Sequence, residues 1–184
     1  LGRVPQTILD FGAGIGNALP PMRAAFPDTR LVALDVSAAS LDLVNAQKIA
    51  GVSTLAYDGI SIPLPDNSID CVFTACVFHH IPVDHHIPLL REIRRVLRPD
   101  GAFVLFEHNP ANPLTRRAVA RCEFDRDAVL INAAEMRHRL LAAGFDAVDR
   151  RYCLFLPPVL GRMRRLERLL HWLPLGAQYH LIGR

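Results

Sequence analysis

The sequence has no apolar run long enough to cross a membrane and no paired cysteine motif. Its 184 residues include four cysteines (Cys71, Cys76, Cys122 and Cys153), without CxxC or zinc-ligand spacing. A transmembrane helix needs about 20 apolar residues, and no signal-peptide pattern is present. We therefore expect a cytoplasmic protein with reduced thiols and no transmembrane segment.

Lysine is nearly absent, since Lys48 is the single lysine among 21 basic residues. We attribute this to the coding bias of the source genome. The net charge is +3, with +6 in residues 150–184 and −3 in residues 1–149. An acidic main part argues against a nucleic-acid groove, so no nucleic-acid partner is expected.

Apolar residues make up 51% of the chain, enough for one domain with a sizeable core. We predict a single domain over residues 1–184. Because the first expected strand begins almost at Leu1, we expect N-terminal residues of the natural protein to be missing.

The chain is organised around a strand, a glycine loop and a helix in residues 7–26. The loop contains three glycines, which allow positive φ and close approach to a ligand (Gly12, Gly14 and Gly16). Such units open doubly wound sheets, which bind ligands at the carboxyl ends of their strands. A tight turn without a ligand is the alternative. Asp35 favours a ligand, because it ends the next strand about 20 residues later, where an acid can accept from ribose hydroxyls.

Strands and helices alternate along the rest of the chain, which predicts an α/β fold: a doubly wound, Rossmann-like three-layer sandwich with a mostly parallel sheet. Sequence does not fix the direction of the last two strands. Ser37 and Asp84 are expected helix caps. Further strands are expected at 31–34, 53–57, 69–75, 102–106, 145–156 and 178–182, helices at 38–50, 85–97, 114–121, 135–143 and 157–174, a turn at 98–101, and water-facing side chains at Arg91, Arg94, Arg95 and Arg98.

Six segments together resemble the class I S-adenosylmethionine-dependent methyltransferases of the small-molecule, type 11-like group. The resemblance covers residues 7–184 and implies a seven-stranded sheet whose last strand is inserted antiparallel between the fifth and sixth. It also implies S-adenosylmethionine as cofactor and S-adenosylhomocysteine as product. The segments are DFGAGIGN at 10–17, LDVS at 34–37, YDG at 57–59, LPDNSIDCV at 64–72, VFHHI at 77–81 and LRPDG at 97–101.

The resemblance also implies the cofactor-binding residues. The glycine loop would hold the methionine part (Gly12, Ala13, Gly14 and Asn17), and Asp10 would face its ammonium group. Asp35 would bind the ribose, Val36 would flank the adenine, Asp58 and Gly59 would bind its edge, and the Ala75 carbonyl would approach the amine. A cationic ligand without phosphate fits carboxylates and carbonyls at strand ends. Each acid has a structural alternative: Asp10 as a loop anchor, Asp35 as a helix-approach acid and Asp58 as a turn residue.

Methyl transfer is an in-line attack on an activated methyl group, in which the enzyme mostly positions the partners. A general base can assist, and the candidates are His79, His80 and Glu107, with His108 beside them. The alternative for the histidines is that they only fix their loop.

The HHxxxxHH pattern at 79–86 raises the question of a metal site. Adjacent His79 and His80 cannot easily face one site, and no carboxylate pattern accompanies them, so no metal is expected.

Residues 109–130 are expected to form a substrate-side insertion. Its start, NPAN, lies after the wrong strand for the motif of nucleic-acid-base methyltransferases, and that interpretation is rejected. Arginines at 116, 117 and 121 contact an acidic substrate group or face solvent. The arginine-rich helix at 157–174 covers the sheet edge or touches a membrane surface.

The sequence therefore predicts methyl transfer to a small-molecule or lipid/sugar-type acceptor. The alternatives are a nicotinamide-dependent oxidoreductase, whose fingerprint needs glycine where Asn17 stands, and a non-catalytic S-adenosylmethionine-binding protein. The acceptor, the methylated atom and the oligomeric state are not predicted.

Overall fold

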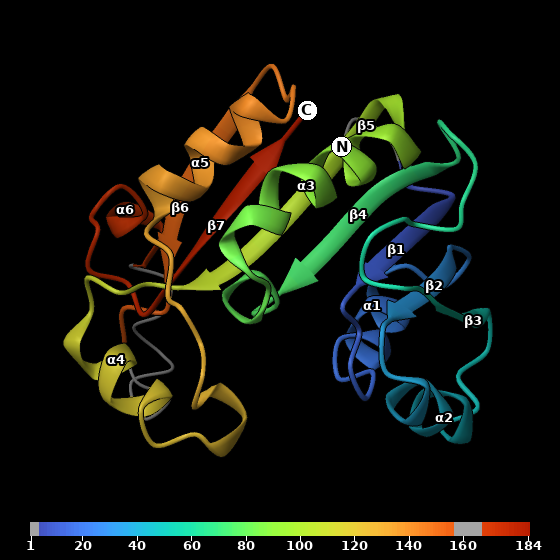
Figure 1. Ribbon diagram of the computed structural model, residues 1–184, viewed down its shortest axis with the longest axis horizontal. Coiled ribbons are helices and arrows are strands. Elements are labelled where there is room, and N and C mark those ends of the chain that lie inside the picture. Colours follow the sequence, from blue (N-terminus) through green and yellow to red (C-terminus); the bar gives the residue numbers. More distant parts are fainter. Residues whose placement is uncertain (1–3, 157–166) are drawn as a thin grey trace.

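The computed structural model describes residues 4–156 and 167–184, which form three layers around a seven-stranded sheet (Figure 1). The strand order is β3-β2-β1-β4-β5-β7-β6. The strands are β1 Thr7–Phe11, β2 Arg30–Asp35, β3 Val52–Ala56, β4 Ile69–Ala75, β5 Leu97–His108, β6 Val148–Cys153 and β7 Gln178–Gly183.

Strands β1 to β5 are parallel to one another, and β7 runs antiparallel to both β5 and β6. This confirms the predicted fold class, including the inserted antiparallel strand near the C-terminus.

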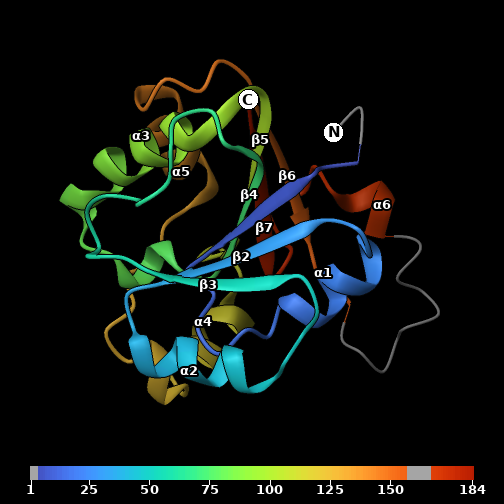
Figure 2. The ribbon, with the colours of Figure 1, turned by 90° about the vertical axis from the view of Figure 1, so that its right-hand side faces the viewer.

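Both faces of the sheet are covered by helices, as Figure 2 shows. Side chains of a strand alternate between the faces, so Ile8 of β1 packs with Leu19 and Val44, whereas Leu9 joins the cluster of Leu90 and Met136. The first face carries α1 Leu19–Ala25 and α2 Ala38–Ala46, and the second carries α3 His86–Val96 and α5 Ala133–Ala142.

The remaining helices lie towards the C-terminal half. α4 Pro113–Val119 confirms the helix expected in the insertion, and the Asn112 side chain caps it by accepting from Leu114 N and Thr115 N. Of the arginine-rich helix expected at 157–174, residues 157–166 lie outside the described residues. The described part is helical only over α6 Glu167–Leu170, and residues 171–174 form turns.

Two local predictions are wrong. Ser37 caps α2 as expected, but α3 has no side-chain cap, because a 3₁₀ turn, η2 Val83–His85, precedes it and includes Asp84. Residues 98–101 belong to β5 instead of forming a turn. Arg98 Nη1 donates to Asp70 Oδ1 at 2.6 Å, which holds this segment beside β4 across a register shift.

Arg98 is partly buried and does not simply face water, and the same is true of Arg95. The Arg95 guanidinium donates to the carboxylates of Glu92 and Asp66 and to the carbonyls of Ile62 and Leu64. Among the helices of the described residues, none combines the length and apolar character needed to cross a membrane.

Candidate functional site

A cavity of about 670 Å³ lies at the carboxyl ends of β1 to β4, where doubly wound sheets bind ligands. Predicted cofactor residues supply much of its wall. Its lining is formed by Gly12, Gly14, Asp35, Val36, Tyr57, Asp58, Gly59, Ile60, Cys76, Val77, His80, Ile81, Pro82, His85 and Leu89.

The glycine loop turns sharply from β1 into the cavity wall. Gly12 has φ +72°, and an added Cβ would lie 2.6 Å from Val77 Cγ2. Gly14 has φ +52°, and a Cβ there would meet open space. Gly12 is therefore required for packing, whereas Gly14 leaves room for a ligand against the backbone.

Asp35 at the end of β2 holds the loop and faces the cavity. Its Oδ2 accepts from Gly14 N at 2.7 Å, and its Oδ1 accepts from Ser37 N at 2.8 Å. A carboxylate has about four acceptor directions, so each oxygen retains capacity for a ligand hydroxyl. The loop-ordering role and the ribose-binding role are compatible.

Asp58 follows β3 at the cavity rim. Its Oδ1 accepts from Ile60 N and Ser61 N, both at 2.8 Å, and these hydrogen bonds hold the pKa of the carboxyl below its usual value. The exposed side chains of Val36 and Ile60 add apolar surface to the same rim. This edge combines an acceptor with apolar walls, as a purine requires.

Asp10 is buried beneath the loop, with 3% of its surface exposed. Burial, together with the nearby Asp35 charge, raises the pKa of Asp10 to about 7. Its Oδ2 has no hydrogen-bond partner among the described residues. An unpartnered buried carboxylate oxygen is suited to a cationic ligand group, either directly or through water.

Four expected cofactor residues do not line the cavity: Asp10, Ala13, Asn17 and Ala75. Asn17 and Ala75 are exposed. After β4 the wall is formed instead by Cys76, at φ +58°, and Val77.

Glu107, at the end of β5, ties down the segment that follows β4. Its Oε1 accepts from Val77 N at 3.0 Å and Phe78 N at 2.8 Å, while Oε2 lies 2.6 Å from His79 Nδ1. Glu107 and His79 are both almost fully buried. Although burial opposes protonation, the Glu107 hydrogen bond raises the pKa of His79.

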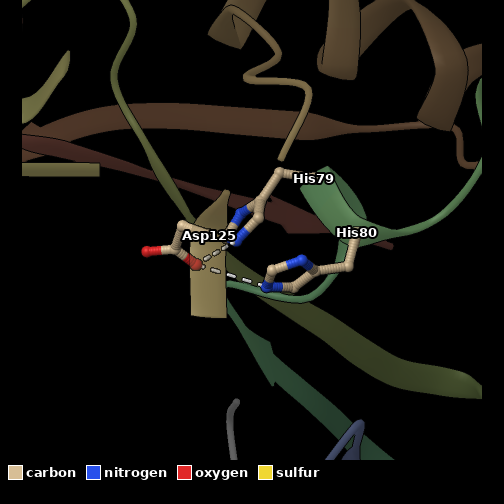
Figure 3. Close-up of side chains that lie close together, drawn as sticks. All are labelled: His79, His80 and Asp125. Atoms are coloured by element: carbon tan, nitrogen blue, oxygen red, sulfur yellow. Dashed lines mark ion pairs between the residues drawn. The ribbon is translucent and has the colours of Figure 1, made fainter. Parts of the chain in front are cut away.

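His80 reaches the cavity, whereas the buried His79 does not line it. Both belong to η1 Phe78–His80. The Nε2 atoms of His79 and His80 lie 3.4 Å and 3.3 Å from the same Asp125 Oδ1 (Figure 3). The expectation that adjacent histidines cannot face one site is therefore wrong for these two, because η1 turns both rings towards one carboxylate.

Asp125 was not predicted as a site residue. It belongs to η3 Glu123–Asp125 in the insertion, whose backbone reaches the histidines through Val129 N, which donates to His79 O at 2.8 Å. The sequence predicts a substrate-side insertion at 109–130 but contains no spacing signal for this acid. The His108 ring lies 5.3 Å from the His79 ring, on the same side of the site.

The fold and site define a Rossmann-like domain. Three neighbouring strand ends carry carboxylates, which are hydrogen-bond acceptors, rather than a cluster of phosphate-binding groups. A family model described as "Methyltransferase domain" matches residues 9–105. The chain belongs to this family of S-adenosylmethionine-dependent methyltransferases. The oxidoreductase alternative is therefore wrong.

Known proteins agree with this assignment. The chain is 34% identical over 177 residues to the malonyl-[acyl-carrier protein] O-methyltransferase of Methylococcus capsulatus, covering 92% of this chain and 63% of that protein. It is 28% identical over 123 residues to the ubiquinone/menaquinone biosynthesis C-methyltransferase of Hahella chejuensis, covering 63% of this chain and 49% of that protein. A solved methyltransferase structure from Archaeoglobus fulgidus has the same fold, with a TM-score of 0.75 and 15% sequence identity. The match covers 97% of this chain and 85% of that one. The chain spans between 35% and 63% of the length of such curated relatives.

Proposed function

We propose that the protein transfers a methyl group from S-adenosylmethionine to a small-molecule or lipid/sugar-type acceptor. The observation that carries this proposal is the ring of carboxylates at the ends of β1, β2 and β3, with an open backbone surface at Gly14 between them. The bound cofactor supplies an activated methyl group on a cationic sulfur.

Residues that line the cavity and residues beside it have binding roles in this proposal. Gly12 and Gly14, with the backbone at Ala13 and Asn17, hold the methionine part, and the Asp10 carboxylate compensates its ammonium charge. The other groups bind the nucleoside: Asp35 the ribose, Val36 the adenine face, and Asp58 with Gly59 the adenine edge. The Ala75 carbonyl is proposed to approach the amine from the end of β4.

The acceptor is proposed to bind beside His80, the histidine of η1 that lines the cavity. Burial, with the charge of His79, lowers the pKa of His80 and favours its neutral form. Glu107 and His79 act through the position of η1, since both are buried and joined at 2.6 Å. The insertion closes this side through Asp125 and Val129.

Calorimetric titration with S-adenosylhomocysteine tests the cofactor assignment, with NAD as the control ligand. We expect binding of the first alone and a strong loss of affinity in Asp35→Ala. Binding of NAD alone would contradict the assignment. Cofactor binding without turnover on any acceptor would favour the non-catalytic alternative.

The relatives suggest the first two acceptors to test. One is named for O-methylation of malonyl-[acyl-carrier protein], and the other for C-methylation in quinone biosynthesis. Transfer of labelled methyl to a malonyl thioester and to a demethylquinone would distinguish an oxygen acceptor from a carbon acceptor.

A further inference from the structure

Three potential metal ligands converge where η1 meets the insertion. One possible ligand atom from each of His79, His80 and Asp125 lies within 4.8 Å of the other two (Figure 3). The three residues come from two segments of the chain, and Asp125 lies 45 residues after His80 in the sequence. We propose that these three side chains bind a divalent transition-metal ion of the zinc type.

The neutral form of the His79 ring presents the lone pair that a metal ligand needs. The Glu107 carboxylate can only accept, so the proton of the neutral ring lies on Nδ1, which donates at 2.6 Å. The lone pair is then on Nε2, whose side chain is 0% exposed and which has no hydrogen-bond partner among the described residues. This lone pair faces Asp125 Oδ1, another acceptor, and a cation between them would satisfy both atoms.

The distances from Asp125 Oδ1 to the two imidazole nitrogens fit a small ion. Zinc bonds to nitrogen and oxygen are about 2.0–2.1 Å, which puts neighbouring ligands of a tetrahedral site about 3.3 Å apart. Asp125 Oδ1 lies 3.4 Å and 3.3 Å from the two imidazole nitrogens. Two neutral imidazoles and one carboxylate are a ligand set suited to zinc or ferrous iron.

Surrounding hydrogen bonds hold the ligands in place. Glu107 supports His79 from behind, in the carboxylate–histidine arrangement common around bound metals. The same carboxylate accepts from Val77 N and Phe78 N, which fixes η1. The backbone bond from Val129 N to His79 O joins the insertion to η1. The site is therefore organised by both segments that supply ligands.

Three protein ligands leave a fourth position for another group. His80 lines the cofactor cavity with its side chain 42% exposed, so the open position lies at the edge of that cavity. Resting on the proposed function, this placement indicates an acceptor that coordinates through oxygen, such as a hydroxyl, enol or carboxylate. His80 then acts as a ligand instead of a free base.

The test measures metal binding without cofactor, acceptor or affinity tag. Protein stripped with a chelator is titrated with Co²⁺, followed by visible absorption, and with Zn²⁺, followed by metal analysis after dialysis. We expect about one ion per chain, and a roughly tenfold or greater loss of affinity in His80→Ala and in Asp125→Asn. The exposed His138→Ala and Asp127→Asn serve as matched controls and should bind as the unchanged protein does.

An unchanged protein that retains no zinc and shows no cobalt band would overturn the proposal, and the cluster would then be held by a proton on His79. Metal affinity in the two ligand variants equal to that of the unchanged protein would also overturn it. Circular dichroism checks the folding of each variant. Titration with S-adenosylhomocysteine tests the proposed function separately, because the proposed cofactor contacts do not include the metal ligands. Cofactor binding can therefore fail while metal binding is observed, and the reverse.

Discussion

Gly12 and Gly14 in the glycine loop have different roles: Gly12 allows close packing, whereas Gly14 leaves space for a ligand. In Gly12→Ala the new methyl group would press on Val77, in a backbone conformation of φ +72°. Left-handed strain and overpacking together should cost about 2–4 kcal/mol in the free energy of unfolding. Gly14→Ala meets no neighbour and should cost about 1–2 kcal/mol from strain alone.

Urea unfolding measures this difference, and S-adenosylhomocysteine titration should show that Gly14→Ala loses affinity while it remains folded. A Gly12→Ala protein as stable as the Gly14→Ala protein would contradict the close contact with Val77.

Asp10 should make the cofactor-free protein less stable as the pH rises. Its pKa is about 7 in the folded protein, against the ordinary value of 3.8 that an aspartate has in an unfolded chain, so the folded state binds the proton more tightly between these values. The contribution of Asp10 to stability therefore falls from pH 4 to pH 7 and is constant above, by at most on the order of 4 kcal/mol.

Asp10→Asn removes this titration. Urea unfolding at pH 5 and pH 8 should show the variant gaining on the unchanged protein at pH 8, although it binds S-adenosylhomocysteine more weakly. A stability difference that is equal at both pH values would show that Asp10 is not buried as a titrating acid.

At the scale of elements, Arg95 of α3 fixes the connection between β3 and β4. Its guanidinium contacts Glu92, Asp66 and two carbonyls of that connection, and Glu92 in turn accepts from Ile62 N at 3.0 Å. Because lysine cannot reproduce the planar set of donors, Arg95→Lys should cost about 1–2 kcal/mol. Faster limited proteolysis at residues 60–66 and weaker cofactor binding at the Asp58 rim should accompany it.

Arg91→Lys on the same helix is the matched control, since Arg91 is exposed. Equal proteolysis rates in the two variants would show that the connection does not depend on Arg95.

The sequence allowed prediction of the features that are local. The glycine loop and Asp35 follow buried strands, and Asp58 comes two residues after β3, so the strand pattern also locates them at one edge of the sheet. Asp125 could not be found in this way, because its place depends on a backbone bond from the irregular insertion to His79. The contacts of Arg95 with Asp66 and with the carbonyls of Ile62 and Leu64 escape prediction for the same reason, since these three residues lie in a connection without periodicity.

At the scale of the whole molecule, Gly176 lies against β6 and contacts the residue that follows β5. An added Cβ would clash with Cys153 O and lie 2.8 Å from Cys153 N, and the Gly176 carbonyl accepts from Asn109 Nδ2 at 2.8 Å. Gly176→Ala must push β6 away from the segment leading into β7, at a cost of about 1–3 kcal/mol. Urea unfolding should show a lower midpoint with an unchanged slope.

Leu175→Ala, at a neighbouring residue that is 59% exposed, should leave the midpoint nearly unchanged. A similar loss in both variants would place the effect in the turn instead of the strand contact.

The residues of the cavity and those of the cluster of His79, His80 and Asp125 are distributed differently along the sequence. Every described residue that lines the cavity proposed for the cofactor lies between Gly12 and Leu89, whereas Asp125 comes from the later insertion. On the proposed function, the part of the chain that binds the methyl donor can be inherited unchanged while the insertion is exchanged. A lineage could acquire a new acceptor by replacing residues 109–130 and keeping its methyl donor.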